Sequence, residues 1–507
     1  MQFHTIVTHE SPDLDALLCC YLLHTYGEPR YPGIQKAQIR FYPAGNLPDN
    51  KTPDQLEQEG ILVVDMGGGR LDTHPSGNAL QKNKLFLSAA NLVAADLGIA
   101  EKGSLKNLLE FVRLHDSTGK SLSSRNPVDH LMSLPTLVRG GLLHFGHDFT
   151  GMTRLFANIF HAIETANDDD SEEHRKLKNS YLIGSKGDCF FIPSTFSLKS
   201  FCSGYIADRI MKKKLLWEES ASDLDNKWEN LTNFSESFKL YDYPELQKLL
   251  FFLDRLKPSN YLLDSNTPID QTISLINIIK GFCLLYQGRI EQVKEAVFLL
   301  LDCVLAYERE WNDAVSEYQK KRQLYVVGSI RLAVISATSG VATKAARWLD
   351  KPDVILFQDT NEFNISISLN QLGRLKNYTL TSLCARIRAA ELFFDESQPG
   401  GLLRGDLSVV GEMAGWFLHQ SEKLLVHGSP KSRRSPTKIP LLVLVEIVLS
   451  EFDKKHKLPN EICPNDRCLQ RECVFFGLQL ENCFLHRENL RCRNEAAQKH
   501  IPEATKI

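Results

Sequence analysis

The sequence predicts an α/β protein with two α/β lobes, and three observations indicate it. Short apolar runs alternate with helical patterns in the first part of the chain, which is typical of a parallel sheet covered by helices. A second set of apolar runs returns late in the chain. The 507 residues, 43% hydrophobic and 24% charged, can form several cores. We expect four regions: an α/β domain over 1–150, a mostly helical insertion over 151–320, a second, smaller α/β lobe over 321–440, and a helix with a cysteine-rich tail over 441–507.

Individual elements follow from the periodicity of apolar residues. The run at 60–65 is continuous and apolar, as in a parallel strand that is buried on both faces. The other strands are expected at 3–8, 38–43, 323–327, 332–336, 353–357 and 363–369. Helices are expected from Asp15 and over 85–98, 104–114, 245–256, 272–320 and 441–455.

Charge and apolar content exclude some classes of protein. The chain has 59 Lys and Arg against 62 Asp and Glu, so it has no overall basic field. Nucleic-acid binding would therefore need a local groove, and a permanent coat for duplex DNA is excluded. No basic segment followed by an apolar one opens the chain, and the apolar runs are too short to span a bilayer. We expect a soluble cytoplasmic protein with no membrane partner.

The segment from Thr8 to Ala16 carries the most informative polar residues. It lies between the first expected strand and the first helix, where open α/β sheets bind ligands. Asp13 and Asp15 alternate in what we expect to be an extended turn, and His9 can approach the same point. Asp15 is also a candidate N-cap for the helix. The alternative is that these residues only form a turn.

A second polar segment follows the buried strand. Asp65 ends that strand, and Gly67 and Gly68 come directly after Met66. Glycines let the backbone approach a metal ion or a phosphate closely, and their N–H groups can line an anion nest. The alternative is that Asp65 caps a strand.

Two further candidates are His74 and Asp116, the second just after the helix expected over 104–114. Together with the earlier residues they offer carboxylate oxygens and a minority of imidazoles. Such a set suits Mn²⁺ or Mg²⁺ better than a soft ion.

Taken in order, these motifs resemble the DHH phosphoesterase superfamily. The first reads His-x-x-x-Asp-x-Asp-Ala from His9, the second Val-Asp-x-Gly-Gly from Val64, and the third Asp-Thr-His from Asp72. The superfamily includes exonucleases, oligoribonucleases, cyclic-dinucleotide phosphodiesterases and family II pyrophosphatases. The first two motifs are most similar to the branch of the melanocyte proliferating gene exonuclease. The resemblance covers residues 5–120 well and 325–430 weakly.

The resemblance implies a catalytic domain with two divalent ions, Mn²⁺ or Mg²⁺. It implies as their ligands His9, Asp13, Asp15, Asp65, His74 and Asp116, with Asp65 shared between the ions. Asp65, His74 and Asp116 would act in catalysis. Residues 406–429 resemble the closing segment of the branch, which implies that His419 and Ser429, together with Gly67 and Gly68, contact the substrate.

We therefore expect a metal-dependent hydrolase of phosphodiesters, a nuclease or oligonucleotide phosphodiesterase with its site in a cleft between the lobes. Its substrate would be a nucleic acid, an oligonucleotide or a nucleotide. The chain departs from the family at Thr73, where the family has a histidine. This departure favours the alternative of a catalytically weakened DHH-like protein that binds nucleotides or nucleic acid as a regulatory or scaffold module.

The tail contains five cysteines between Cys463 and Cys492. Their density favours a zinc site or an iron–sulfur cluster, with candidate ligands Cys463, Cys468, Cys473 and Cys483. The spacing is not Cys-x2-Cys, so a small helical tail with incidental cysteines remains the alternative. Arginines interleave with the cysteines, which makes the tail the best local basic patch.

Overall fold

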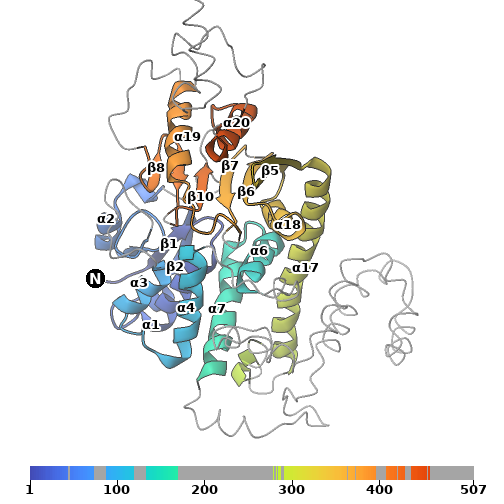
Figure 1. The fold of residues 1–507 in the computed structure, drawn as a ribbon. Helices are drawn as coiled ribbons and strands as arrows, with labels where there is room; N and C mark the ends of the chain where they lie inside the picture. The colour runs from blue at the N-terminus through green and yellow to red at the C-terminus, as the bar shows by residue number, and fades with distance from the viewer. Residues whose placement is uncertain are drawn as a thin grey trace, which may run out of the picture. The chain divides into compact units, whose positions relative to one another are not determined.

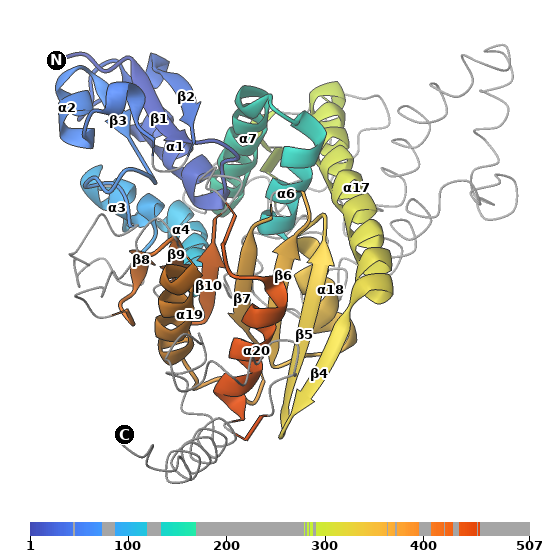
Figure 2. The same cartoon turned by 90° about the horizontal axis from the view of Figure 1, so that it is seen from above.

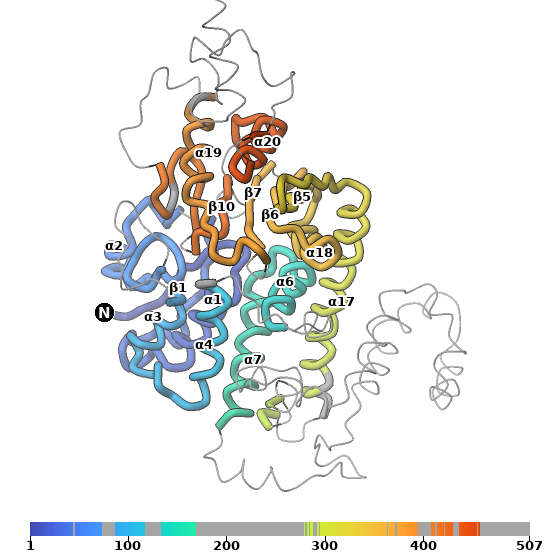
Figure 3. The backbone as a smooth tube through the Cα atoms, viewed as in Figure 1, coloured from blue at the N-terminus to red at the C-terminus, as the bar shows by residue number. Residues whose placement is uncertain are grey.

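The computed structural model is mixed α/β, as the sequence predicts, and its chain divides into two compact units, Met1–Asn312 and Asp313–Ile507. The structure describes residues 1–43, 46–73, 87–118, 133–168, 278, 281–282, 284–286, 290–361, 363–370, 373–394, 407–419, 421–428, 436–453 and 455–456; the remainder is grey in Figure 3. His74, Ser429 and the cysteine tail lie outside these ranges. Among the described helices, none is both long enough and apolar enough to cross a membrane.

The first unit contains a three-stranded parallel sheet, blue in Figure 1, in which β1 (Thr5–His9) lies between β2 (Gln38–Tyr42) and β3 (Ile61–Val63), as Figure 2 shows. All five residues of β1 are buried, as expected for a central parallel strand. Because β1 pairs with both neighbours in parallel, the three carboxyl ends lie at one edge of the sheet. The parallel sheet predicted from the sequence is confirmed.

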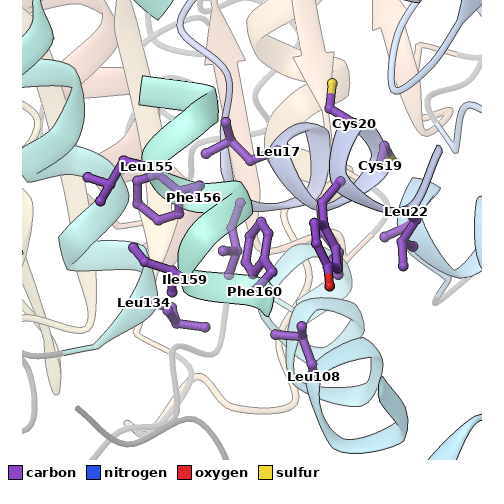
Figure 4. Packing of buried hydrophobic residues seen from close by; sticks show 14 of the residues in the cluster. Leu17, Cys19, Cys20, Leu22, Leu108, Leu134, Leu155, Phe156, Ile159 and Phe160 are labelled. Atoms are coloured by element: carbon purple, nitrogen blue, oxygen red, sulfur yellow. The ribbon is translucent and has the colours of Figure 1, made fainter. Parts of the chain in front are cut away.

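Helices of the first unit pack around one long hydrophobic core. Its centre is α1 (Leu14–Tyr26), which is apolar on all sides and buried from Leu14 to Leu23. Figure 4 shows Leu17 of α1 with Phe156 and Phe160 of α7 in this core. The other described helices of the unit are α2 (Pro53–Gln58), α3 (Ala89–Asp96), α4 (Gly103–Thr118), α6 (Leu134–Phe145) and α7 (Phe149–Asn167), and α17 (Ile290–Lys321) begins in it.

A mixed sheet of seven strands forms the second unit, in the order β4-β5-β6-β7-β10-β9-β8. Only β5 and β6 pair in parallel, joined by α18 (Val341–Leu349), and the other described pairs are antiparallel. In Figure 2, α19 (Thr381–Phe394) and α20 (Leu441–Phe452) cover one face of this sheet and α18 covers the other. The strands are β4 (Gln323–Val327), β5 (Ile330–Ala337), β6 (Val354–Asp359), β7 (Ile365–Leu369), β8 (Gly411–Met413), β9 (Trp416–Leu418) and β10 (Leu424–His427).

One buried carboxylate links three segments of the first unit. Glu164 of α7 accepts hydrogen bonds from the Tyr21 hydroxyl of α1 at 2.6 Å, from Lys102 Nζ at 2.6 Å and from Ser104 Oγ at 3.2 Å. Tyr26 also donates to it. Burial alone would raise the pKa of Glu164, but the hydrogen bonds from Lys102 and the two tyrosines outweigh it and hold this pKa below its ordinary value.

We predict that Glu164→Gln lowers the free energy of unfolding by about 1–3 kcal/mol, because it leaves buried donors poorly paired. Since the folded pKa lies below the ordinary value of 4.5, the ionised carboxylate stabilises the fold above that pH, and this contribution is lost as the pH falls through the folded pKa. Urea unfolding at pH 7 and at decreasing pH measures both effects.

The control is Glu110→Gln on α4, whose partner is the nearby Arg113 on the same helix at 2.6 Å. This more exposed pair should change the free energy of unfolding by less than about 0.5 kcal/mol. Equal effects of the two substitutions on the free energy of unfolding would show that Glu164 stabilises the fold no more than the more exposed Glu110 does.

Candidate metal centre

Three segments of the first unit meet at the carboxyl edge of the parallel sheet. His9 ends β1, Asp13 precedes α1, and Asp65 follows β3. Each offers one nitrogen or oxygen atom, and these atoms lie within 4.8 Å of one another. His9 and Asp65 are buried, whereas 45% of the Asp13 side chain is exposed. The three residues form a group that could hold a metal ion.

The imidazole of His9 is oriented by the backbone beside it. Its Nδ1 lies 3.0 Å from the carbonyl oxygen of Glu10, and because a carbonyl only accepts, Nδ1 carries a hydrogen in this contact. Nε2 then faces Asp65 Oδ2 at 3.2 Å and Asp13 Oδ2 at 3.6 Å. Either a second proton or a metal ion must lie between Nε2 and these oxygens. A histidine that ligates a metal is commonly oriented in this way.

The two carboxylate oxygens of Asp13 contact different partners. Oδ1 accepts from the backbone N–H of Ala16 at 3.1 Å, which makes Asp13 the N-cap of α1, and Oδ2 is the oxygen that faces His9. The interpretation of Asp15 as the N-cap is therefore wrong. The helix begins one residue before Asp15, at Leu14, so Asp15 lies within its first turn.

Asp65 occupies a tight loop with an unusual backbone. Its φ is +54°, a left-handed conformation that is strained for a residue other than glycine. Its N–H donates to the Leu71 carbonyl at 3.1 Å, which closes the loop. Inside the loop, Gly68 N–H donates to Asp72 Oδ2 at 2.7 Å, so this predicted anion-nest donor binds a carboxylate of the chain itself. Gly67 and Gly68 both have a positive φ, which this path of the backbone requires.

Asp15 is buried beside the group of three but is not part of it. Its two oxygens accept from the backbone N–H groups of Ala89 and Ala90, at 2.7 and 2.8 Å, at the start of α3. Burial raises the pKa of Asp15 well above its ordinary value, and the carboxylates of Asp65, Asp116 and Asp13 raise it further. The carboxylates of Asp13, Asp65 and Asp116 are therefore close enough to Asp15 to interact with it.

The remaining predicted site residues are not part of the group of three or lie outside the described ranges. Asp116 lies in the last turn of α4, which continues to Thr118 and does not end before Asp116 as predicted. His419 belongs to the second unit, in the turn between β9 and β10, where its Nδ1 accepts from the Ser421 N–H at 3.1 Å. Nothing described bears on His74 or Ser429.

Sequence reasoning missed two interactions at this edge. One is the Asp72 carboxylate that holds the Asp65 loop, and the other is the start of α3 that binds Asp15. A capping box of Ser88 and Asn91 indicates where α3 begins, so the start of this helix could be predicted from the sequence. No local pattern indicates that this helix start meets Asp15, which is far away in the sequence.

The raised pKa of Asp15 predicts an unusual pH dependence. In protein stripped of metal with EDTA, the folded state binds more protons than the unfolded state above the ordinary Asp pKa of 3.8. The free energy of unfolding should therefore fall as the pH rises from that value through the folded pKa. Asp15→Asn should remove this part of the slope. Parallel pH profiles of melting temperature for the two proteins would contradict the prediction.

Comparison of the chain with protein-family models, with curated proteins and with solved structures found no match. The resemblance to the DHH superfamily thus depends on the motif residues alone. What the structure adds is that His9, Asp13 and Asp65 come together as a group able to hold a metal ion.

Proposed function

We propose that this chain is a divalent-metal-dependent phosphoesterase that hydrolyses a phosphodiester of a nucleic acid or a short oligonucleotide. The observation that carries the proposal is the convergence of His9 Nε2 with one oxygen each of Asp13 and Asp65. Carboxyl edges of parallel strands are the usual ligand-binding place in open α/β sheets, which supports this assignment.

The donor set fits a hard or borderline ion. Two carboxylate oxygens and one imidazole nitrogen match Mn²⁺ or Mg²⁺ better than a soft ion. His9 is already oriented by the Glu10 carbonyl, and Asp13 by its N-cap bond to Ala16. The donors are thus held in place by the chain, which favours tight binding.

Charge at this edge supports an anionic substrate only if cations are bound. Without them, the carboxylates of Asp13, Asp15, Asp65 and Asp116 would repel a phosphate. Asp116, and His74 by the resemblance, would complete a second ion position, with Asp65 shared. Divalent ions supply such hydrolysis with an activated water and with positive charge beside the phosphate oxygens.

In the second unit, His419 has the chemistry of a phosphate contact. Its Nδ1 accepts from the Ser421 N–H, so in the neutral ring the hydrogen is on Nε2, which is then a donor. A donor of this kind suits a phosphate oxygen. The nucleic-acid substrate is favoured over a small phosphoanhydride because the chain is much longer than two lobes alone require.

We predict that Asp65→Asn lowers Mn²⁺-dependent hydrolysis of bis-p-nitrophenyl phosphate by a factor on the order of 10³ or more. A neutral amide is a poor ligand between cations, and it leaves their repulsion uncompensated. Turnover, bound Mn²⁺ and melting temperature should be measured on the same preparation.

The matched control is Asp353→Asn in the second unit. Asp353 is also buried, but it directly precedes β6, accepts from the backbone N–H of Arg331 and lies outside the proposed site. It should lose stability without losing turnover per folded molecule. An Asp65→Asn protein with normal turnover would remove the central residue from the mechanism.

The regulatory alternative gives a different result in the same assays. A catalytically weakened protein would bind Mn²⁺ and nucleotides or oligonucleotides but hydrolyse neither the aryl phosphodiester nor a labelled oligonucleotide. Wild-type protein that binds no Mn²⁺ at all would refute the enzyme and the metal centre together.

The cysteine tail lies outside the described residues, so its zinc or iron–sulfur site stays a prediction. We expect Cys468→Ser combined with Cys473→Ser to lower the bound zinc or iron, measured by elemental analysis, and to leave hydrolysis unchanged. The reason is that soft thiolates and hard carboxylates select different ions. Wild-type protein with neither zinc nor iron would contradict the tail site.

A further inference from the structure

Arg70 is a charged side chain through which the Asp65 loop contacts other elements of the first unit. It lies within the loop, next to Leu71, whose carbonyl accepts from the Asp65 N–H. Its guanidinium makes a bidentate pair with Glu57 of α2, with Nε and Nη2 at 3.1 and 2.8 Å from the carboxylate oxygens. Nη1 lies 2.9 Å from Asp96 Oδ1 at the end of α3.

Tyr31 adds an aromatic ring to the contacts of Arg70. The Tyr31 hydroxyl accepts from Arg70 Nη2 and donates to Asp96, and the guanidinium carbon of Arg70 lies 5.6 Å from the centre of the ring. One exposed ion pair contributes little to stability, but a bidentate pair within a network fixes geometry. The loop is therefore joined to α2, to α3 and to the segment that follows α1.

The same helix, α3, is fixed at both ends by residues of the site region. Its first N–H groups bind Asp15, and its last residue, Asp96, binds Arg70. The position of the Asp65 loop and the position of Asp15 are thus set against one rigid element.

The contacts of Arg70 matter because the backbone of Asp65, in the same loop, is strained. A left-handed φ at an aspartate is strained, and such a conformation persists only where the surrounding structure determines it. We propose that Arg70 is a positioning residue that holds the Asp65 loop closed and so sets the affinity of the metal centre. The part of this inference that concerns the affinity for metal rests on the proposed function.

Electrostatics alone predicts the opposite sign. Arg70 is a cation, and removing it should by itself strengthen the binding of Mn²⁺ through reduced repulsion. Weaker binding after its removal would therefore report the loss of positioning.

The chain offers a matched control in Arg30. This residue also makes a bidentate pair with Asp96, at 2.8 and 2.7 Å, and also lies over Tyr31, but it follows α1 and is outside the loop. Arg70→Gln and Arg30→Gln remove the same charge from the same network. Arg70→Lys keeps the charge and loses the fork of donors.

Two measurements on the full-length protein test the proposal. Titration with Mn²⁺ gives the Kd, and hydrogen exchange of the segment 64–73 reports the closure of the loop, with or without metal. We expect Arg70→Gln to raise the Kd about tenfold or more and to speed exchange at Asp65 and Gly68. Arg70→Lys should be intermediate, and Arg30→Gln should match the wild type in exchange and bind Mn²⁺ at least as tightly as the wild type.

Unchanged exchange or tighter Mn²⁺ binding in Arg70→Gln would overturn the proposal. Equal changes in Arg70→Gln and Arg30→Gln would overturn it as well, because the effect would then come from general loosening around Asp96. If wild-type protein binds no Mn²⁺, the proposed function fails, and the exchange data alone decide whether Arg70 closes the loop. If Arg70→Gln does not fold, the same comparisons between Arg70→Lys and Arg30→Gln decide the outcome.

Discussion

Mutual repulsion among carboxylates at one edge of a parallel sheet is the constraint to which the first unit is adapted. Asp13 accepts from the first turn of α1 and Asp15 from the first turn of α3, whereas Asp65 faces Nε2 of His9, where a second proton or a metal ion must lie. Helix N-termini carry partial positive charge. The start of α3 therefore offsets part of the negative charge of the carboxylates that α1 and the loops after the strands place at this edge. The remaining negative charge is what a cation would neutralise.

The parallel sheet makes this concentration of charge possible. Residues far apart in sequence, such as His9 and Asp65, meet because parallel strands place the loops after their carboxyl ends at the same edge. The loops then need sharp turns, and two of these turns contain left-handed residues that are not glycine, Ser11 and Asp65. Strain of this kind is commonly found where function requires a fixed geometry.

Much of this arrangement could be predicted from sequence, for a physical reason. Apolar runs locate β1 to β7, and strand ends of a parallel sheet necessarily meet, so the meeting of His9, Asp13 and Asp65 followed from local patterns. The three short strands β8 to β10 were not predicted individually, because three or four residues show little alternation. The prediction that Asp15 is the N-cap of the first helix was also wrong. The partner of Asp15 is the start of a helix far along the chain, and long-range pairing leaves no local signal.

The double use of Asp13 limits which residues its position can accept. If Asp13 served only as the N-cap of α1, serine, threonine or asparagine would be accepted at this position about as well as aspartate. Each of these caps the helix but lacks the second, anionic oxygen that faces His9. Substitution of this residue by one of them should therefore be tolerated by the fold but should remove one of the three donors of the group that could hold a metal ion. At such a position, the oxygen that the fold requires and the oxygen that a metal ion would require belong to one side chain.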